Sequence, residues 1–200
     1  MARPTSNEQE DRIVAAARAE VVEVGAAALT QRSVAKRAGV SPQSIYNRFG
    51  DQHALLDAVA DRAFVELAAR LQAEDGHLLD DITDPVENVI EGLARYRRFA
   101  MGNPRLYGLM FDAQVGDFRI SDRTLGTAFD SLQVLVRAVE RGIEAGVLSE
   151  ADPLEVAQRI WAAAHGVLRF ELTDVGFVDD WDRHYESTIR TMLRGLGASA

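Results

Sequence analysis

The sequence predicts an all-α protein, and three observations support this fold class. Apolar residues recur with helical spacing through most of the 200 residues, without a convincing stretch of strand-like alternation. Apolar residues make up 47% of the chain, which is enough for a packed core. An N-capping residue directly followed by proline, a common helix start, occurs four times, at Ser41-Pro42, Asp84-Pro85, Asn103-Pro104 and Asp152-Pro153. We expect about nine helices.

The first two expected helices are bounded by capping residues. The first covers about residues 9–24 and ends at Gly25, with an apolar stripe facing the core. The second follows Thr30, whose hydroxyl is expected to accept a hydrogen bond from the amide of Ser33. It is expected to end at Gly39, because glycine readily adopts the left-handed conformation that ends a helix.

The third expected helix covers residues 42–49, with Ser41 as its N-cap and Pro42 at its first position. It therefore meets the second helix across a three-residue turn, which is the arrangement of a helix-turn-helix. In the third helix, Ile45 and Phe49 share one face and are expected to pack on the second helix.

The rest of the chain predicts six more helices and two connecting segments. The helices are expected over about residues 52–73, 85–101, 104–111, 122–145, 153–173 and 179–196. Residues 74–84 are expected to form a polar, acidic linker, and residues 114–120 an irregular stretch. We place the domain boundary after residue 50, so that a three-helix head (1–50) precedes a larger helical domain (51–200).

The charge is distributed unevenly between these two parts. The whole chain has a net charge of -9, which taken alone argues against a nucleic-acid partner. Residues 1–50, however, hold seven Lys or Arg and five Asp or Glu, whereas residues 51–200 hold 15 and 26. Within residues 24–50 there are four basic residues and no acid, namely Arg32, Lys36, Arg37 and Arg48. A short basic module is thus joined to a large acidic one.

The outward residues of the third expected helix suit DNA. They are Gln43, Ser44, Tyr46, Asn47 and Arg48. Glutamine can bond adenine and arginine can bond guanine in the major groove, while hydroxyl and amide side chains commonly hold phosphates. Each of these residues could equally lie on a solvated surface. The prediction of DNA binding is specific because these residues occur together with the two helix caps and with a basic segment that contains no acid.

Residues 13–25, 29–41 and 45–50, with Leu55-Leu56 after them, resemble the N-terminal signature of the TetR-type bacterial transcriptional regulators. The resemblance implies a homodimeric repressor that binds double-stranded DNA at a pseudo-palindromic operator and is released by a small-molecule effector. It implies base contacts by Arg32 and Gln43, an apolar contact by Pro42, and mainly backbone contacts by Gln31, Ser44, Tyr46, Asn47 and Arg48. Thr30 and Lys36 complete the expected DNA-binding set. The family usually has a phosphate-binding lysine at the start of the fourth helix, where this sequence has Gln52-His53.

The C-terminal part resembles one subtype of that family, named after a Trp-His-Gly (WHG) motif. Residues 96–100 and 103–111 are similar to its segment around the fifth and sixth helices, and Trp161, His165 and Gly166 match the motif itself. Trp161 and His165 lie four residues apart on one helix face, and Gly166 permits a close helix approach. A role for His165 in the core or dimer interface remains an alternative to ligand contact.

Two further sites are expected in the larger domain. A pocket for an apolar or aromatic effector is expected to be lined by Phe64, Tyr96, Phe99, Tyr107, Met110, Phe111, Trp161 and His165. The last two helices have more apolar positions than one core-facing stripe requires, which predicts that they form a homodimer. The expected interface residues are Leu154, Ala157, Trp161, Gly166, Ile189 and Leu193.

Several function classes are disfavoured. Cysteine is absent, and the four histidines are dispersed, so we expect no disulfide, metal site, cofactor or catalytic residue. No apolar run is long enough to span a membrane and no signal segment is evident, which predicts a cytoplasmic protein. The alternatives are a helical-bundle ligand carrier or enzyme with a vestigial head, and an architectural protein that coats DNA. The net negative charge argues against the latter.

Overall fold

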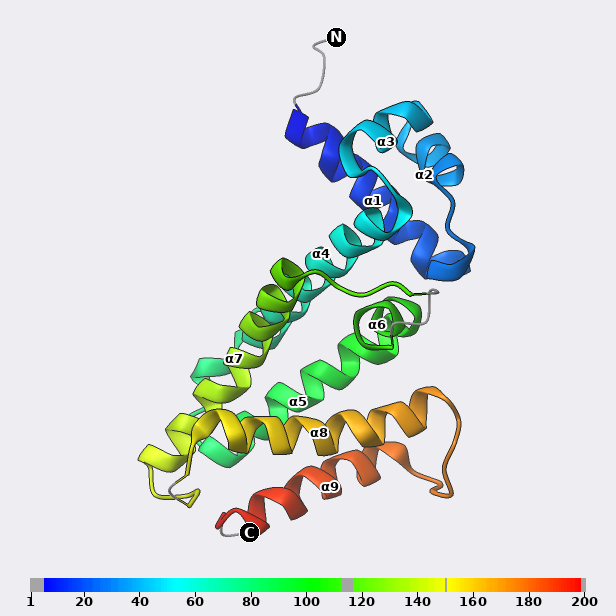
Figure 1. Cartoon of the computed structure of the whole chain (residues 1–200). Coiled ribbons are helices and arrows are strands. Elements are labelled where there is room, and N and C mark those ends of the chain that lie inside the picture. The colour runs from blue at the N-terminus through cyan, green and yellow to red at the C-terminus, as the bar shows by residue number, and fades with distance from the viewer. Residues whose placement is uncertain (1–5, 113–116, 150, 199–200) are drawn as a thin grey trace. The chain divides into compact units, whose positions relative to one another are not determined.

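The computed structural model describes residues 6–112, 117–149 and 151–198, and within these ranges it has nine α-helices. The predicted all-α class is confirmed (Figure 1). The chain divides into two compact units. The first comprises residues 1–65 and 103–128, and the second comprises residues 66–102 and 129–200. No helix in the described ranges is both long enough and apolar enough to cross a membrane.

The first unit contains the three N-terminal helices. Its elements are α1 (Ser6–Val24), η1 (Ala26–Ala28), α2 (Gln31–Ala38), α3 (Pro42–Phe49), the first part of α4 (Gln52–Gln72), α6 (Pro104–Phe111) and the start of α7 (Asp122–Glu144). α1 contacts α2, η1 and α6. Its apolar stripe, which includes Ile13, Ala17 and Val21, is fully buried, as are Val34 of α2 and Ile45 of α3. These side chains form the core that fixes α3 in place.

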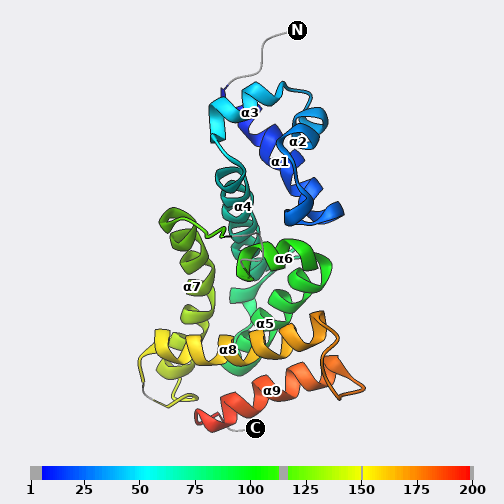
Figure 2. The same cartoon turned by 45° about the vertical axis from the view of Figure 1, so that its right-hand side comes forward.

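The second unit holds the C-terminal helices. Its elements are the end of α4, β1 (Ala73–Glu74), β2 (His77–Leu78), η2 (Leu79–Asp81), α5 (Pro85–Gly102), most of α7, α8 (Pro153–Leu172) and α9 (Trp181–Gly195). α8 and α9 lie side by side, and both contact α5 (Figure 2). The phenol of Tyr185 on α9 is buried and donates a hydrogen bond of 2.9 Å to the carbonyl of Leu93 on α5.

The prediction of a linker over residues 74–84 was wrong. β1 and β2 form an antiparallel hairpin in which Ala73 pairs with Leu78, and η2 follows it directly. Its two turn residues, Asp75 and Gly76, both have positive φ (51° and 81°), the pattern of a tight hairpin turn. Buried Asn88 of α5 donates hydrogen bonds to carbonyls of η2 and of the residue that follows it. Turn geometry and these bonds therefore order the segment.

The predicted starts of α5, α7, α8 and α9 are confirmed by their caps, whereas α1 begins at Ser6, three residues before its predicted start. The carboxylates of Asp84, Asp152 and Asp180 accept hydrogen bonds from the first turns of α5, α8 and α9, and the hydroxyl of Ser121 does so for α7. Of the two acids expected to begin the last helix, Asp180 is thus the cap. Of the expected irregular stretch, residues 114–116 lie outside the described ranges, and residues 117–120 form neither helix nor strand.

Candidate nucleic-acid interface

The turn between α2 and α3 is fixed by local hydrogen bonds. The Thr30 hydroxyl accepts a hydrogen bond of 3.1 Å from the Ser33 amide, and the Ser41 hydroxyl accepts one of the same length from the Ser44 amide. Between the helices, Gly39 adopts the left-handed conformation with φ 65° and ψ 39°. The predicted bounds of α3 and both predicted caps are confirmed. The sequence around residues 30–44 therefore encodes a rigid helix-turn-helix.

The inner faces of the two helices hold α3 against the core. Ile45 of α3 is fully buried, as are Val34 and Ala35 of α2. Arg12 of α1 donates a hydrogen bond of 2.5 Å to the carbonyl of Ala38, in the last turn of α2. This places a positive charge at the negative end of that helix and satisfies an otherwise unpaired carbonyl.

The outer face of α3 is polar and open to solvent. Pro42, Gln43, Tyr46 and Asn47 are exposed, and Tyr46 has 60% of its surface accessible. The side-chain amide of Gln43 donates a hydrogen bond of 2.7 Å from Nε2 to Oδ1 of Asn47. Ser44 and Arg48, which were expected on the same face, are half-buried.

The basic residues of this region fall into two groups. Arg32 and Lys36 on α2 are exposed and have no hydrogen bond or ion pair to another residue in the described ranges. Arg37 is ion-paired with Glu20 and Glu23 of α1 at 2.9 and 2.5 Å, and Arg48 is ion-paired with Glu10 of α1. Sequence reasoning missed this pairing because it counted charges along the chain, whereas α1 brings its acids to α2 and α3 in space.

Two other members of the expected DNA-binding set take part in local structure. Thr30 uses its hydroxyl as the cap of α2, and the half-buried Gln31 side chain donates a 3.5 Å hydrogen bond to the carbonyl of Gly50. Gln31 therefore connects the start of α2 to the end of α3. Both residues lie at the N-terminus of α2, where backbone amides and the helix dipole favour an anion such as phosphate.

The start of α4 differs from the usual phosphate-binding arrangement. The carboxylate of Asp51 accepts a hydrogen bond of 2.8 Å from the amide of Ala54 and so caps the helix. His53, in the first turn, is exposed, and its ring centroid lies 5.9 Å from that of the buried Phe118. This helix start provides one neutral amide, Gln52, and one imidazole in place of a lysine.

Four of the residues predicted to line a pocket lie in the first unit. Phe64, Tyr107 and Met110 are buried, and Phe111 is half-buried. The Phe111 ring packs edge-on against Phe64 with centroids 5.4 Å apart, and it lies 4.8 Å from the Tyr107 ring. These contacts form an aromatic cluster within this unit.

The other four predicted pocket residues lie in the second unit. Tyr96 and Phe99 of α5 are buried. The Tyr96 hydroxyl and Nδ1 of His165 are 2.9 Å apart and share a hydrogen bond, and the ring centroids of Trp161 and His165 are 5.5 Å apart. Trp161 and His165 thus share one face of α8, with a polar Tyr-His pair beside an indole ring. This arrangement can hold an aromatic group and bond a hydroxyl.

The residues predicted for the dimer interface have two different surroundings. Ala157, Ile189 and Leu193 are buried within the single chain, where α8 and α9 pack. Leu154 is exposed, and Trp161 and Gly166 are half-buried. A β-carbon added at Gly166 would meet no atom within 4 Å, so this part of α8 has free space beside it.

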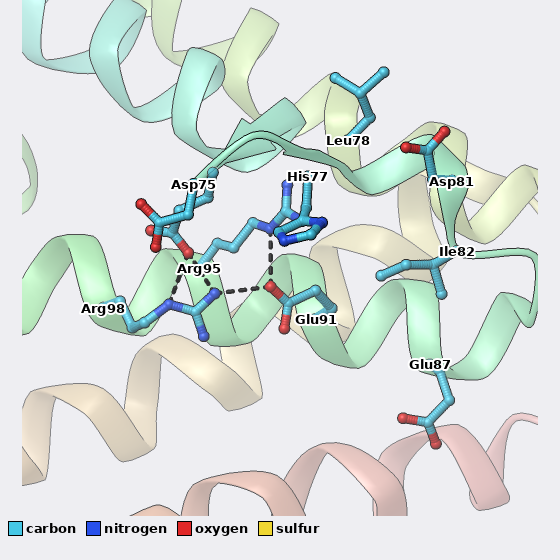
Figure 3. A pocket seen from close by; sticks show the side chains of 10 residues that line it. Asp75, His77, Leu78, Asp81, Ile82, Glu87, Glu91, Arg95 and Arg98 are labelled. Atoms are coloured by element: carbon cyan, nitrogen blue, oxygen red, sulfur yellow. Dashed lines mark hydrogen bonds and ion pairs between the residues drawn. The ribbon is translucent and has the colours of Figure 1, made fainter.

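A cavity of about 560 Å³ in the second unit contains none of the eight predicted pocket residues (Figure 3). Its lining is Glu74, Asp75, His77, Leu78, Asp81, Ile82, Glu87, Glu91, Arg95 and Arg98. The buried Arg95 donates to Glu91 at 2.9 Å and to the carbonyl of Leu71 at 3.2 Å, while Arg98 donates to Glu74 and Glu91. With five carboxylates and two guanidinium groups, the lining favours a cationic over an apolar ligand.

Both parts of the chain match known protein families. Residues 13–59 match the family described as bacterial regulatory proteins of the tetR family. Residues 89–195 match the family described as the tetracyclin repressor-like C-terminal domain. An HTH-type transcriptional regulator of Mycobacterium tuberculosis is 26% identical over 152 residues, which cover 75% of this chain and 64% of that relative.

Solved structures share the fold over nearly the whole chain. A protein of unknown function from Rhodococcus sp. RHA1 has a TM-score of 0.77 and 24% identity, covering 94% of this chain and 95% of its own. RolR in complex with resorcinol has a TM-score of 0.72 and 22% identity, and the match covers 97% of this chain and 90% of RolR.

Proposed function

Since this chain belongs to the TetR family of DNA-binding transcriptional regulators, we propose that it is a homodimeric repressor released from a pseudo-palindromic operator by a small molecule. The capped helix-turn-helix with an exposed polar face on α3 carries this proposal. Residues 1–50 form the DNA-binding domain, and residues 51–200 form the ligand-binding and dimerisation domain. The protein acts in the cytoplasm and is not an enzyme.

α3 enters the major groove and acts as the recognition helix. Gln43 on α3 and Arg32 on α2 contact base edges, and Pro42 makes an apolar contact. The phosphate backbone is bound by the remaining residues of the set, namely Thr30, Gln31, Lys36, Ser44, Tyr46, Asn47 and Arg48. The exposure of Tyr46 and the unpaired state of Arg32 and Lys36 among the described residues support these roles.

The homodimer forms through the outward face of α8 together with α9. Leu154, Trp161 and Gly166 are each at least partly accessible on α8, and the open space at Gly166 allows a second helix to come close. Ala157, Ile189 and Leu193 support this face from inside by fixing α8 against α9. Two heads in one dimer then read two half-sites related by two-fold symmetry.

The effector is an aromatic compound with a hydroxyl group, and it binds beside Tyr96, Phe99, Trp161 and His165. The Tyr96-His165 hydrogen bond provides the polar partner, and the Trp161 ring beside it provides the apolar surface. The likeness to RolR, whose solved complex contains resorcinol, supports a phenolic class. The same geometry supports assignment of the C-terminal domain to the WHG subtype.

Release requires only modest coupling between effector and DNA. A ligand shifts the equilibrium by its difference in affinity for the DNA-binding and released conformations. A 100-fold loss of operator affinity corresponds to about 2.7 kcal/mol of coupling. A few contacts that exist in only one conformation are therefore sufficient.

The first test is selection of DNA fragments from a random pool by the full-length protein. We expect a palindromic consensus whose binding persists in competition with bulk DNA. Recovery of fragments without a consensus would favour an architectural protein, and failure to retain DNA would favour a ligand carrier.

The second test adds phenols, beginning with resorcinol, to the preformed complex. We expect release from DNA by at least one phenol, and a weaker response in Tyr96→Phe with ligand-free DNA binding unchanged. Loss of ligand-free binding in this variant would instead assign Tyr96 to the core. If no phenol weakens binding, the phenolic effector is excluded.

A further inference from the structure

We propose that Asn47 is a positioning residue, which orients the amide of Gln43 so that Gln43 accepts adenine and rejects guanine. The proposal rests on the DNA-binding function above, and it is carried by the 2.7 Å hydrogen bond between Gln43 Nε2 and Asn47 Oδ1. Both side chains are exposed on α3, one helical turn apart.

The hydrogen bond changes what the Gln43 side chain can offer to a base. A free glutamine amide has two N–H donors on Nε2 and an acceptor oxygen, and it can rotate to present either group. Asn47 Oδ1 accepts a hydrogen bond from one of the two N–H donors and so holds Nε2 on the side of Gln43 that faces Asn47. The remaining edge of Gln43 therefore has one N–H donor and one oxygen acceptor, in a fixed order along the helix.

One base matches this edge in the major groove. Adenine presents an acceptor at N7 and a donor at N6, so it accepts from Nε2 and donates to Oε1 of Gln43. Guanine presents two acceptors, N7 and O6, and would need both N–H groups of Nε2. Because Asn47 occupies one of these two N–H groups, one of the two guanine acceptors has no donor and lies opposite the amide oxygen of Gln43. Thymine and cytosine each offer a single hydrogen-bonding group there.

The arrangement leaves Asn47 free for a second contact. Its oxygen is used by Gln43, but its own amide N–H groups have no partner among the residues that the structure describes. They can donate to a phosphate without breaking the bond to Gln43. Bound DNA would then restrain Asn47, and Asn47 in turn would restrain Gln43.

The experiment compares the wild-type protein with Asn47→Ala and Asn47→Asp on the operator selected by the wild type. The position read by Gln43 is first identified as the base at which Gln43→Ala loses its preference. That base is then replaced by guanine, by 7-deazaadenine, which lacks the N7 acceptor, or by purine, which lacks the N6 amino group. Thermal melting confirms that each variant is folded.

For the wild type, we expect all three replacements to weaken binding, with guanine at least about fivefold worse than adenine. Asn47→Ala frees the amide to rotate, so its discrimination against guanine should fall to within about twofold. Asn47→Asp keeps the acceptor oxygen, so it should preserve the preference for adenine while binding all sequences more weakly, since it adds negative charge near phosphates.

Two outcomes would overturn the inference. One is a base other than adenine at the position read by Gln43, and the other is unchanged discrimination against guanine in Asn47→Ala. Both differ from failure of the proposed function, in which the wild-type protein selects no DNA sequence at all.

Discussion

Glu10 of α1 is ion-paired with Arg48 in the last turn of α3, so the single basic residue of α3 is neutralised within the protein. Arg37 of α2 is paired in the same way with two acids of α1. The acid-free segment over residues 24–50 therefore presents fewer net positive charges than its sequence indicates. In a complex, a DNA phosphate would compete with the Glu10 carboxylate for Arg48.

Removing the carboxylate of Glu10 should strengthen DNA binding. In Glu10→Gln, Arg48 loses its ion pair with Glu10 and can meet a phosphate without competition from that carboxylate, so we expect tighter binding and a steeper salt dependence. The slope of log K against log salt should become more negative by up to about 0.9, the value for one additional phosphate contact. Titrations of operator DNA at several salt concentrations measure both effects.

The adjacent Asp11 provides the matched control. It is ion-paired with Arg62 of α4, so Asp11→Asn makes the same charge change on α1 without freeing a cation of α2 or α3. We expect a smaller change in affinity and little change in slope. Equal slopes in Glu10→Gln and the wild type would show that Glu10 does not keep Arg48 from a phosphate.

Arg32 and Lys36 on α2 should respond differently to substitution. Arg32→Ala is expected to cost about 1 to 3 kcal/mol of operator binding and to relax the preference at one base pair in each half-site. Lys36→Ala is expected to weaken binding to all sequences alike and to make the salt slope less steep by about one. If Arg32→Ala weakens binding to operator and random DNA equally, Arg32 contacts the DNA backbone and not a base.

The predictable parts of the fold are those set by neighbouring residues. α3 begins and ends at the predicted positions because Ser41, Pro42 and Gly50 act within one turn of the chain. The hairpin at residues 73–78 was missed because strands of two residues are too short for alternation to be visible. The Asp75-Gly76 dipeptide was the available signal, since both residues favour the positive φ found there.

The features that could not be predicted depend on which helix faces pack against each other in the folded protein. Helical spacing alone placed Ala157, Ile189 and Leu193 on apolar faces, but it does not say whether α5 or a second chain covers them. Likewise, the pairing of Arg48 with Glu10 joins residues 38 positions apart. A charge count along the chain cannot detect such a pair, so it overestimated the basic surface of the candidate site.

A large charged side chain at position 166 should impair both dimerisation and DNA binding. A β-carbon added at Gly166 meets no atom within 4 Å, so the Gly166→Glu protomer should fold, while a partner helix would be held away. Gly126→Glu on α7 is the control, since a β-carbon added at that helical glycine also meets no atom within 4 Å. Sedimentation and operator titration measure both effects. A Gly166→Glu protein that remains dimeric would exclude this face of α8 from the interface.

The ion pair of Glu20 with Arg37 should make the stability of the protein depend on pH. The hydrogen bond from Arg37 lowers the pKa of Glu20 below its ordinary value of 4.5, and a contact with Ser33 adds to the effect. Because the folded-state pKa is lower than the unfolded-state value, the stabilisation is complete above pH 4.5. It is lost as the pH falls through the lowered pKa.

We therefore expect the melting temperature of Glu20→Gln to lie below that of the wild type by a constant difference from pH 7 down to about pH 5. The difference should shrink as the pH falls below 4.5, because the wild type then loses the same charge. In an Arg37→Gln background, Glu20→Gln should have a much smaller effect at every pH, since the main cause of the lowered pKa is absent. A difference that persists unchanged at pH 3, or that is equally large without Arg37, would mean that Glu20 stabilises the protein by packing and not by its charge.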